Sequence, residues 1–307
     1  MRLLPVLLLA AWSLRATTFY VTVAGLGGEP DYEQRFSSWA QEMEKILKAS
    51  GGDSRVETLH GAAATRARVR QVLEGLAREV RAEDALVLVL IGHGAFDGFE
   101  YKFNLPGPDL SDSELASLLE KIRAQRQLVV ITTSASGAAI ELLRKENRVV
   151  ITATKSGTEK NATVFARYWV EGLRDPSADT DKNEAISALE AFRYAAEKTA
   201  KFYEGQKRLA TEHPLLEDTG KGAGTRSPSL ASGEGRLAAA FTVARFGRAQ
   251  AAAADPARRA LLARKEELEQ QIDRLKYQKA AMDAQEYRKQ LTALLLELAK
   301  TQEEMDK

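Results

Sequence analysis

The chain of 307 residues contains no cysteine. Disulfide bonds and thiolate metal sites are therefore excluded, and so is any mechanism that uses a thiolate nucleophile. The absence of cysteine does not by itself identify the compartment.

The sequence also lacks an excess of either charge. It has 44 basic and 43 acidic residues, for a net charge of +1. This balance argues against a nucleic-acid footprint and against a polybasic membrane surface. The hydrophobic share of 44% and the charged share of 28% are typical of a globular protein.

Long apolar runs are missing apart from one at the amino terminus. Residues 3–14 are apolar, follow Arg2 and precede small residues, which is the pattern of a secretory signal. The run is too short to span a bilayer comfortably. We expect a signal over residues 1–16, cleaved near Ala16, and a secreted or periplasmic protein with no transmembrane segment in its mature chain. The alternative is a buried first strand.

Apolar runs of strand length alternate with helical patterns over residues 17–219. This alternation predicts βαβ units and a three-layer α/β sandwich with a mostly parallel sheet. The expected strands are 19–26, 55–59, 86–91, 128–131 and 148–153. The expected helices are 32–49, 66–80, 112–122, 138–143, 163–173 and 185–207.

The carboxyl-terminal third changes composition. Residues 220–254 are predicted to be a linker with a short apolar element of undefined type, and residues 255–307 to be helical. Leu261, Leu268, Leu275 and Met282 recur every seven residues, and Leu291, Leu298 and Met305 form a second series out of step with the first. We favour a helical hairpin that turns near residues 282–284 over one long coiled-coil helix with a stutter. Its seam predicts self-association or partner docking through residues 257–305; packing on the chain's own domain is the alternative.

Two of the predicted strands end in residues that suit a site. Strand 86–91 runs into Gly92-His93-Gly94, and strand 128–131 runs into Thr132-Thr133-Ser134-Ala135-Ser136-Gly137. Ligands of open α/β sheets bind beyond the carboxyl ends of the strands. A histidine and a hydroxyl at such ends form the layout of a base and its nucleophile, although a lone histidine can be purely structural.

The ordered pair of strand, His-Gly and then strand, Ser-x-Ser-Gly resembles the caspase/legumain-like cysteine peptidases, and the legumain-like (C13) branch most. The resemblance spans roughly residues 18–221. It implies that His93 matches the family's catalytic histidine, that Gly94 matches the oxyanion-binding position, and that Ser134 occupies the place of the catalytic cysteine. By position in the family, Glu29, Asp31, Arg35, Lys155, Ser156 and Thr158 are candidates for specificity.

A serine hydroxyl needs a well-placed base, whereas a thiolate is a good nucleophile near neutral pH. We therefore expect an inactive peptidase homologue that binds a peptide or protein, or acts as a scaffold. One alternative is an active serine-type hydrolase or peptidase that uses Ser134 and His93. Another is a structural assembly protein that acts through its helical tail.

An acidic segment has the spacing of a calcium loop. Asp179, Asp181 and Asn183 lie at positions 1, 3 and 5, and Glu190 lies at position 12. Position 6 is Glu184 where such loops have glycine. We expect no cofactor other than a possible Ca²⁺ here; the alternative is a solvated loop that caps the following helix.

His213 lies in Thr-Glu-His-Pro after the last predicted helix of the sandwich. It either orients a group near the site or is an ordinary loop residue.

Overall fold

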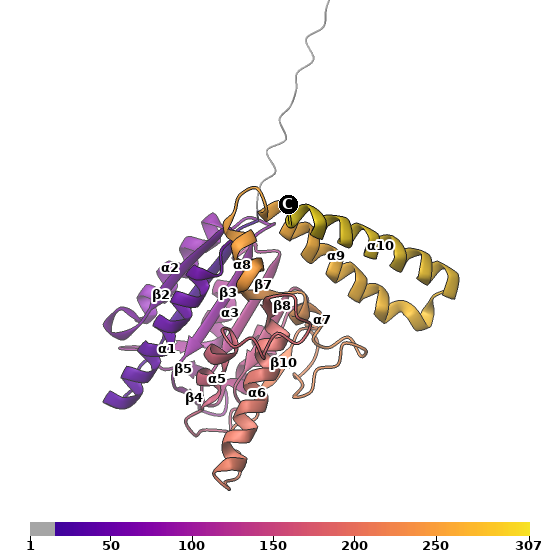
Figure 1. Cartoon of the computed structure of the whole chain (residues 1–307). Helices are drawn as coiled ribbons and strands as arrows, with labels where there is room; N and C mark the ends of the chain where they lie inside the picture. Colours follow the sequence, from indigo (N-terminus) through magenta and orange to yellow (C-terminus); the bar gives the residue numbers. More distant parts are fainter. Residues whose placement is uncertain (1–15) are drawn as a thin grey trace, which may run out of the picture.

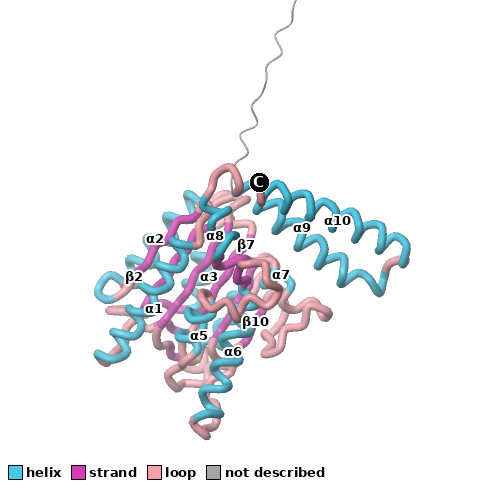
Figure 2. The backbone as a smooth tube through the Cα atoms, in the orientation of Figure 1, coloured by secondary structure: helices cyan, strands magenta, loops and turns pink. Residues whose placement is uncertain are grey.

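A six-stranded sheet forms the centre of the computed structural model, which describes residues 16–307 (Figures 1 and 2). The predicted signal lies outside the described residues, apart from Ala16. Side by side, the strands are β10 (Leu215–Glu217), β8 (Arg148–Thr152), β7 (Arg126–Ile131), β3 (Ala85–Ile91), β1 (Thr18–Ala24) and β2 (Ser54–Leu59). All neighbours are parallel except β10, which runs antiparallel to β8.

Helices cover both faces of this sheet and bury two separate apolar cores. The helices of the first face are α1 (Pro30–Ala49), α5 (Phe165–Gly172) and α6 (Ala188–Gly205). Those of the second face are α2 (Arg66–Glu79), α3 (Asp112–Glu120) and α4 (Ile140–Leu143). The mostly parallel three-layer sandwich predicted from the sequence is therefore confirmed.

Strand β3 shows why its sequence is an unbroken apolar run. Val87, Val89 and Ile91 enter the first core, and Leu86, Leu88 and Leu90 enter the second. A strand buried on both faces has no solvent side for polar residues. Each such side chain contributes about 1.5–3 kcal/mol on burial.

Shorter elements decorate the sheet. A small antiparallel sheet follows β3 and consists of β4 (Gly94–Phe96), β5 (Tyr101–Phe103) and β6 (Leu110–Ser111). The 3-10 turns are Gly61–Ala63, Ser136–Ala139 and Lys279–Ala281. The turn at Ser136–Ala139 replaces the first part of the helix predicted over 138–143.

The helix predicted from residue 185 begins later than expected. Residues Ala185–Ser187 form β9, which pairs with β11 (Thr242–Arg245), and α6 starts at Ala188. The prediction was wrong here because Ser187 and Glu190 form a capping box that fixes the start of the helix. The partner strand lies more than fifty residues away in the sequence, so the local pattern did not reveal it.

Residues 236–254 add folded elements to the sandwich. They form α7 (Arg236–Ala239), β11 and α8 (Gly247–Ala254). Phe241 and Val243 are buried in the first core. The apolar element left undefined by the sequence is thus a short helix followed by a strand.

Helices α9 (Arg259–Gln278) and α10 (Ala284–Met305) form a hairpin that projects from the body (Figure 1). Asp283 caps the start of α10, because its carboxylate accepts the N–H groups of Gln285 and Glu286. Asp283 lies within the turn predicted at residues 282–284. Leu268 and Leu275 of the first heptad series are buried. Among residues 16–307, no helix combines the length and apolar character that crossing a bilayer requires.

Candidate functional site

The carboxyl edge of the sheet collects the predicted site residues. Because β3 and β7 are parallel neighbours, His93 and Ser134 follow strand ends at the same edge. Strand β10 is antiparallel to β8, so the segment before it, including His213, also lies at this edge.

The Ser134 hydroxyl is bonded to the backbone of Gly94. Its Oγ donates to the Gly94 carbonyl at 2.9 Å and accepts from the Gly94 N–H at 3.2 Å. Ser134 is only 3% exposed. The single hydroxyl proton is therefore directed to a carbonyl, and the N–H matched to the oxyanion position is used by Ser134 itself.

Two glycines allow this close packing. A Cβ at Gly94 would lie 2.6 Å from the Ser134 carbonyl oxygen and from Thr133 Oγ1. A Cβ at Gly137 would lie 2.3 Å from the Lys155 carbonyl carbon and the Ser156 nitrogen. Glycine is therefore required at position 94, directly after His93, and at position 137, three residues after Ser134, because backbone segments meet there.

The residue after Ser134 has an uncommon backbone conformation. Ala135 has φ of 58°, the left-handed region that an alanine rarely adopts, and is fully buried. Its N–H donates to the Glu159 carbonyl at 2.8 Å. Such strain persists where the surroundings over-determine it, often at functional turns.

Ser136 joins the end of β7 to the end of β8. Its Oγ accepts the N–H groups of Ala153 at 3.1 Å and Thr154 at 3.2 Å. The Thr154 hydroxyl in turn accepts the Gly137 N–H at 3.0 Å. Ser136 therefore does not cap the next helix, which is the alternative role that its position suggests.

The His93 ring packs against α1. Its centroid lies 4.7 Å from that of Tyr32 and 5.0 Å from that of Phe36, both edge-on. Burial lowers the pKa of His93, while the backbone of Gly27 and the charge of Glu29 oppose this shift. The neutral imidazole is thus favoured at neutral pH.

Among the described residues, no hydrogen bond joins His93 to the Ser134 hydroxyl; the bonds of that hydroxyl go to Gly94. A general base must reach the proton that it removes. In this arrangement the ring faces aromatic neighbours and the hydroxyl faces backbone. The edge offers a polar, shaped surface rather than an aligned nucleophile and base.

The specificity candidates form two groups at this edge. Glu29, Asp31 and Arg35 are exposed around the start of α1, where Arg35 lies 5.5 Å from the centre of the Tyr32 ring. Lys155, Ser156 and Thr158 lie in the loop after β8, in which the two hydroxyls are bonded at 2.8 Å. One group thus neighbours His93 and the other lies beside the Ser134 turn.

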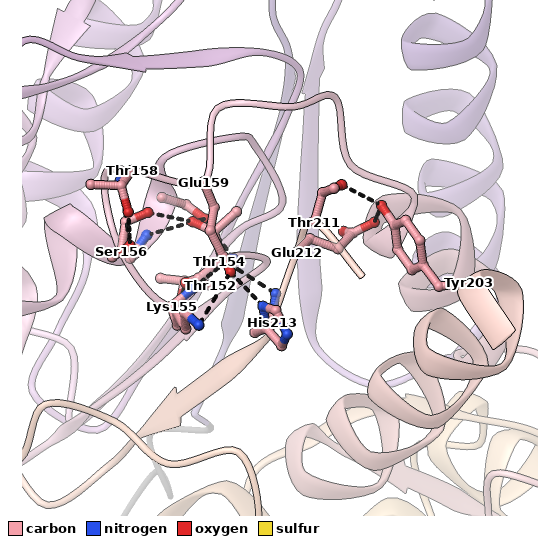
Figure 3. Close-up of polar contacts among 12 residues, drawn as sticks. Thr152, Thr154, Lys155, Ser156, Thr158, Glu159, Tyr203, Thr211, Glu212 and His213 are labelled. Atoms are coloured by element: carbon pink, nitrogen blue, oxygen red, sulfur yellow. Dashed lines mark hydrogen bonds and ion pairs between the residues drawn. The ribbon is translucent and has the colours of Figure 1, made fainter. Parts of the chain in front are cut away.

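A pair that the sequence analysis did not identify links this loop to β10. The Glu159 carboxylate bonds Nδ1 of His213 and accepts the N–H groups of Lys155 at 2.9 Å and His213 at 3.1 Å (Figure 3). His213 therefore orients part of the edge through Glu159, and it is not an isolated loop residue. The two residues are 54 apart in the sequence, so no local pattern connects them.

Glu212 was also missed. It is buried and accepts the Val164 N–H at 2.7 Å and the Phe165 N–H at 3.2 Å. It also accepts the Tyr203 hydroxyl at 3.0 Å (Figure 3). Burial raises the pKa of Glu212 to about 7. This carboxyl fixes the start of α5 against the end of α6, which a sequence pattern cannot reveal.

The acidic loop brings together three of its four predicted ligands. Oxygen atoms of Asp179, Asp181 and Glu190 lie within 4.8 Å of one another. Burial, with the nearby Glu190 charge, raises the pKa of Asp181 to about 7. The side-chain oxygen of Asn183 accepts the Ala185 N–H at 2.8 Å, so its bond is within the loop.

The donor set suits a hard cation, since carboxylate oxygens are what Ca²⁺ prefers. Glu184 at position 6 adopts φ of 65°, so the loop makes the left-handed turn without glycine. Glu190 also bonds Thr180 and the Ser187 cap, and Ser187 is the residue that caps α6. The alternative that Asp and Asn side chains of the loop cap this helix was therefore wrong, because Ser187 and Glu190 form the capping box.

The comparisons with known proteins agree with the resemblance. Residues 57–201 match the model of the peptidase C13 family. No curated protein sequence matches the chain significantly. The match to the peptidase C13 family model confirms the caspase/legumain-like character predicted from the strand-end motifs.

Two solved structures are distantly similar. Protein GSU0716 from Geobacter sulfurreducens shares 15% identity over 66% of this chain and 93% of its own, with a TM-score of 0.44. The Drosophila initiator caspase Dronc shares 10% identity over 67% of this chain and 80% of its own, with a TM-score of 0.46.

Proposed function

We propose that the chain is a catalytically inactive peptidase homologue that binds a peptide or protein segment at the carboxyl edge of its sheet. The observation that carries this proposal is the double hydrogen bond between the Ser134 hydroxyl and Gly94. It gives the only proton of the hydroxyl to a carbonyl and occupies the N–H that would bind an oxyanion. Attack by Ser134 would require both bonds to break and His93 to leave its aromatic contacts.

The chemistry of the residue types supports the same conclusion. A peptidase of this type relies on a thiol, and the chain has no cysteine. An alcohol at the same place is a far weaker nucleophile without a bonded base. A shaped edge with exposed polar groups from two loops can still recognise a segment of another chain.

A peptide-library experiment tests this proposal. The full-length protein is assayed for turnover of a fluorogenic peptide library and for retention of an unlabelled library on the immobilised protein. We expect retention without turnover, and loss of retention in Ala95→Arg, which places a large charged side chain on exposed β4. Ala95 avoids the packing conflict that any side chain at Gly94 would cause.

Turnover that disappears in Ser134→Ala and in His93→Ala would establish the serine hydrolase instead. Absence of both turnover and retention, with partner binding retained by the helical tail, would favour the assembly protein. Arg123→Ala is the matched control, because Arg123 is exposed and precedes β7 at the opposite edge.

We also propose that Asp179, Asp181 and Glu190 bind a divalent cation such as Ca²⁺. The proposal is supported by the convergence of their oxygens and by the raised pKa of Asp181. A cation would relieve the repulsion among these carboxyls and hold β9 and α6 to the preceding loop.

The amino-terminal pattern supports a secreted or periplasmic location for this protein. Fractionation of cells that express the full chain, with mass measurement of the mature amino terminus, tests this location. We expect a chain that starts near Thr17.

A further inference from the structure

A groove lies beside α6, between that helix, residues 210–214 and residues 226–228. Its volume is about 560 Å³, within the range of pockets that hold ligands. Ala196, Pro214 and Pro228 contribute apolar wall. The lining includes neither His93 nor Ser134, so the groove is separate from the strand-end site.

Two arginines at this groove have no acidic partner. Arg226 is exposed and makes no hydrogen bond or ion pair with another residue of the described chain. Arg193 donates to the Pro228 carbonyl at 3.1 Å and leaves the rest of its guanidinium unused. The nearby Glu197 is paired with Lys201. Glu212 also lines the groove, but it is buried and accepts the Val164 and Phe165 N–H groups. The two guanidinium groups are therefore positive charges that no carboxylate of the lining pairs.

A buried hydroxyl on the wall is without a partner. Thr199 is 1% exposed, lines the groove, and its Oγ1 makes no hydrogen bond. A threonine inside a helix commonly bonds a carbonyl of the preceding turn. Because this oxygen is not accessible to solvent, its missing bond costs the fold stability and is not a contact for a groove ligand.

His213 supplies a further polar group to the groove. Because Glu159 bonds Nδ1, Nε2 is the ring nitrogen left for a ligand (Figure 3). The same carboxylate accepts the His213 N–H at 3.1 Å, which fixes the residue on two sides. The ring is thus positioned before any ligand arrives.

We infer that this groove binds an acidic peptide segment, with Arg193 and Arg226 on its carboxylates and His213 on its backbone or side-chain polar groups. Charge complementarity selects this occupant, because two guanidinium groups without an acidic partner favour carboxylates. The apolar wall suits the carbon stems and proline rings of a peptide. This inference goes beyond the strand-end site and does not depend on the state of Ser134.

Fluorescence anisotropy with the full-length protein tests the inference. The probe is a short fluorescein-labelled peptide of alternating glutamate and proline, compared with the same peptide carrying glutamine. We expect the glutamate peptide to bind, with affinity that falls as salt is added. Arg226→Ala should weaken it about tenfold, as the loss of one charge-assisted bond does.

Arg123→Ala and Ala95→Arg serve as controls, the first for general charge and the second for the strand-end site. Both should bind the glutamate peptide as the wild type does, so failure of the groove and failure of the strand-end site are distinguishable. Thr199→Val, which keeps the shape of the side chain, should also bind as the wild type does, because the Thr199 hydroxyl oxygen is not accessible from the groove. Equal binding of the two peptides, no binding by the wild type, or an unchanged affinity in Arg226→Ala would overturn the inference.

Discussion

A hydroxyl group has one proton, and the Ser134 hydroxyl gives its proton to the Gly94 carbonyl. The sequence predicted that His93 and Ser134 follow neighbouring strand ends, because apolar runs mark buried strands. It could not predict the bond to Gly94, which depends on how closely two backbones approach. That approach is possible because position 94 has no side chain.

Replacing Ser134 by alanine removes both bonds to Gly94 and leaves a partly buried N–H and carbonyl without them. We expect Ser134→Ala to lower the free energy of unfolding by about 1–2 kcal/mol. Urea denaturation followed by circular dichroism measures the change. Ser38→Ala, at an exposed position of α1, is the control and should change stability by less than about 0.5 kcal/mol. If Ser134→Ala left the free energy of unfolding unchanged, the Ser134 hydroxyl would not make the two hydrogen bonds to Gly94 that the structure shows.

The buried carboxyl of Glu212 predicts a pH dependence. Its folded pKa of about 7 lies above the ordinary value of 4.5, so the unfolded chain releases this proton first. Stability should therefore fall as pH rises from about 4.5 to 7, by roughly 3 kcal/mol at most, and level off above that. Urea denaturation across this range checks the slope.

Glu212→Gln isolates that slope, because other groups, including Asp181, contribute equally to both proteins. The variant should be less stable overall, since its amide nitrogen cannot accept one of the backbone N–H groups at the start of α5. Its stability should nevertheless decline less steeply with pH. Parallel curves for the two proteins would contradict the raised pKa.

Elements with strong local signals were predictable. The periodic helix 32–49 corresponds to α1, and the hairpin between α9 and α10 turns where the two heptad series break. Strand β9 was not predictable, because Ala185 and Ile186 suit a helix locally and their pairing depends on β11. Tertiary pairing overrides local preference in such short segments.

The acidic loop before α6 predicts a response to calcium. Ca²⁺ should raise the melting temperature of the full-length protein, and at a hundredfold excess over its Kd would add about 3 kcal/mol. Asp181→Asn should abolish the response, because it removes one of the three converging carboxyls. Differential scanning calorimetry with and without Ca²⁺ measures both.

Asp31→Asn, at an exposed position of α1, is the matched control and should keep the full response. The same calcium shift in Asp181→Asn as in the wild type would show that the cation binds elsewhere. No shift in any of the proteins would show that these carboxyls have only a structural role.

At the scale of the whole molecule, the sheet and its two helical layers follow from the alternation of strands and helices. The strand order required the structure, because parallel strands pair with partners distant in the sequence. The contact between the strand-end site and the groove beside α6 is likewise visible only in the three-dimensional structure. Glu159 and His213 connect the two regions across 54 residues.

Self-association through residues 257–305, which the sequence predicts, would have to use the surface of the projecting hairpin. Helices α9 and α10 pack against each other along the heptad positions. The large apolar side chains that stay exposed on α10 are Leu295, which is 47% exposed, and Leu296, which is 60% exposed. We expect a concentration-dependent dimer that is lost when both are changed to glutamate, as measured by light scattering after size-exclusion chromatography. A monomer at every concentration would contradict the prediction and leave the hairpin as part of its own domain.

The reactivity of Ser134 distinguishes an inactive peptidase homologue from a serine hydrolase. The full-length protein is incubated with a fluorophosphonate, and its intact mass and peptide masses are measured. We expect no adduct, because the Ser134 hydroxyl is hydrogen-bonded to Gly94 and has no hydrogen bond to His93. A stoichiometric adduct on Ser134 that disappears in His93→Ala would contradict this expectation and identify a working serine hydrolase.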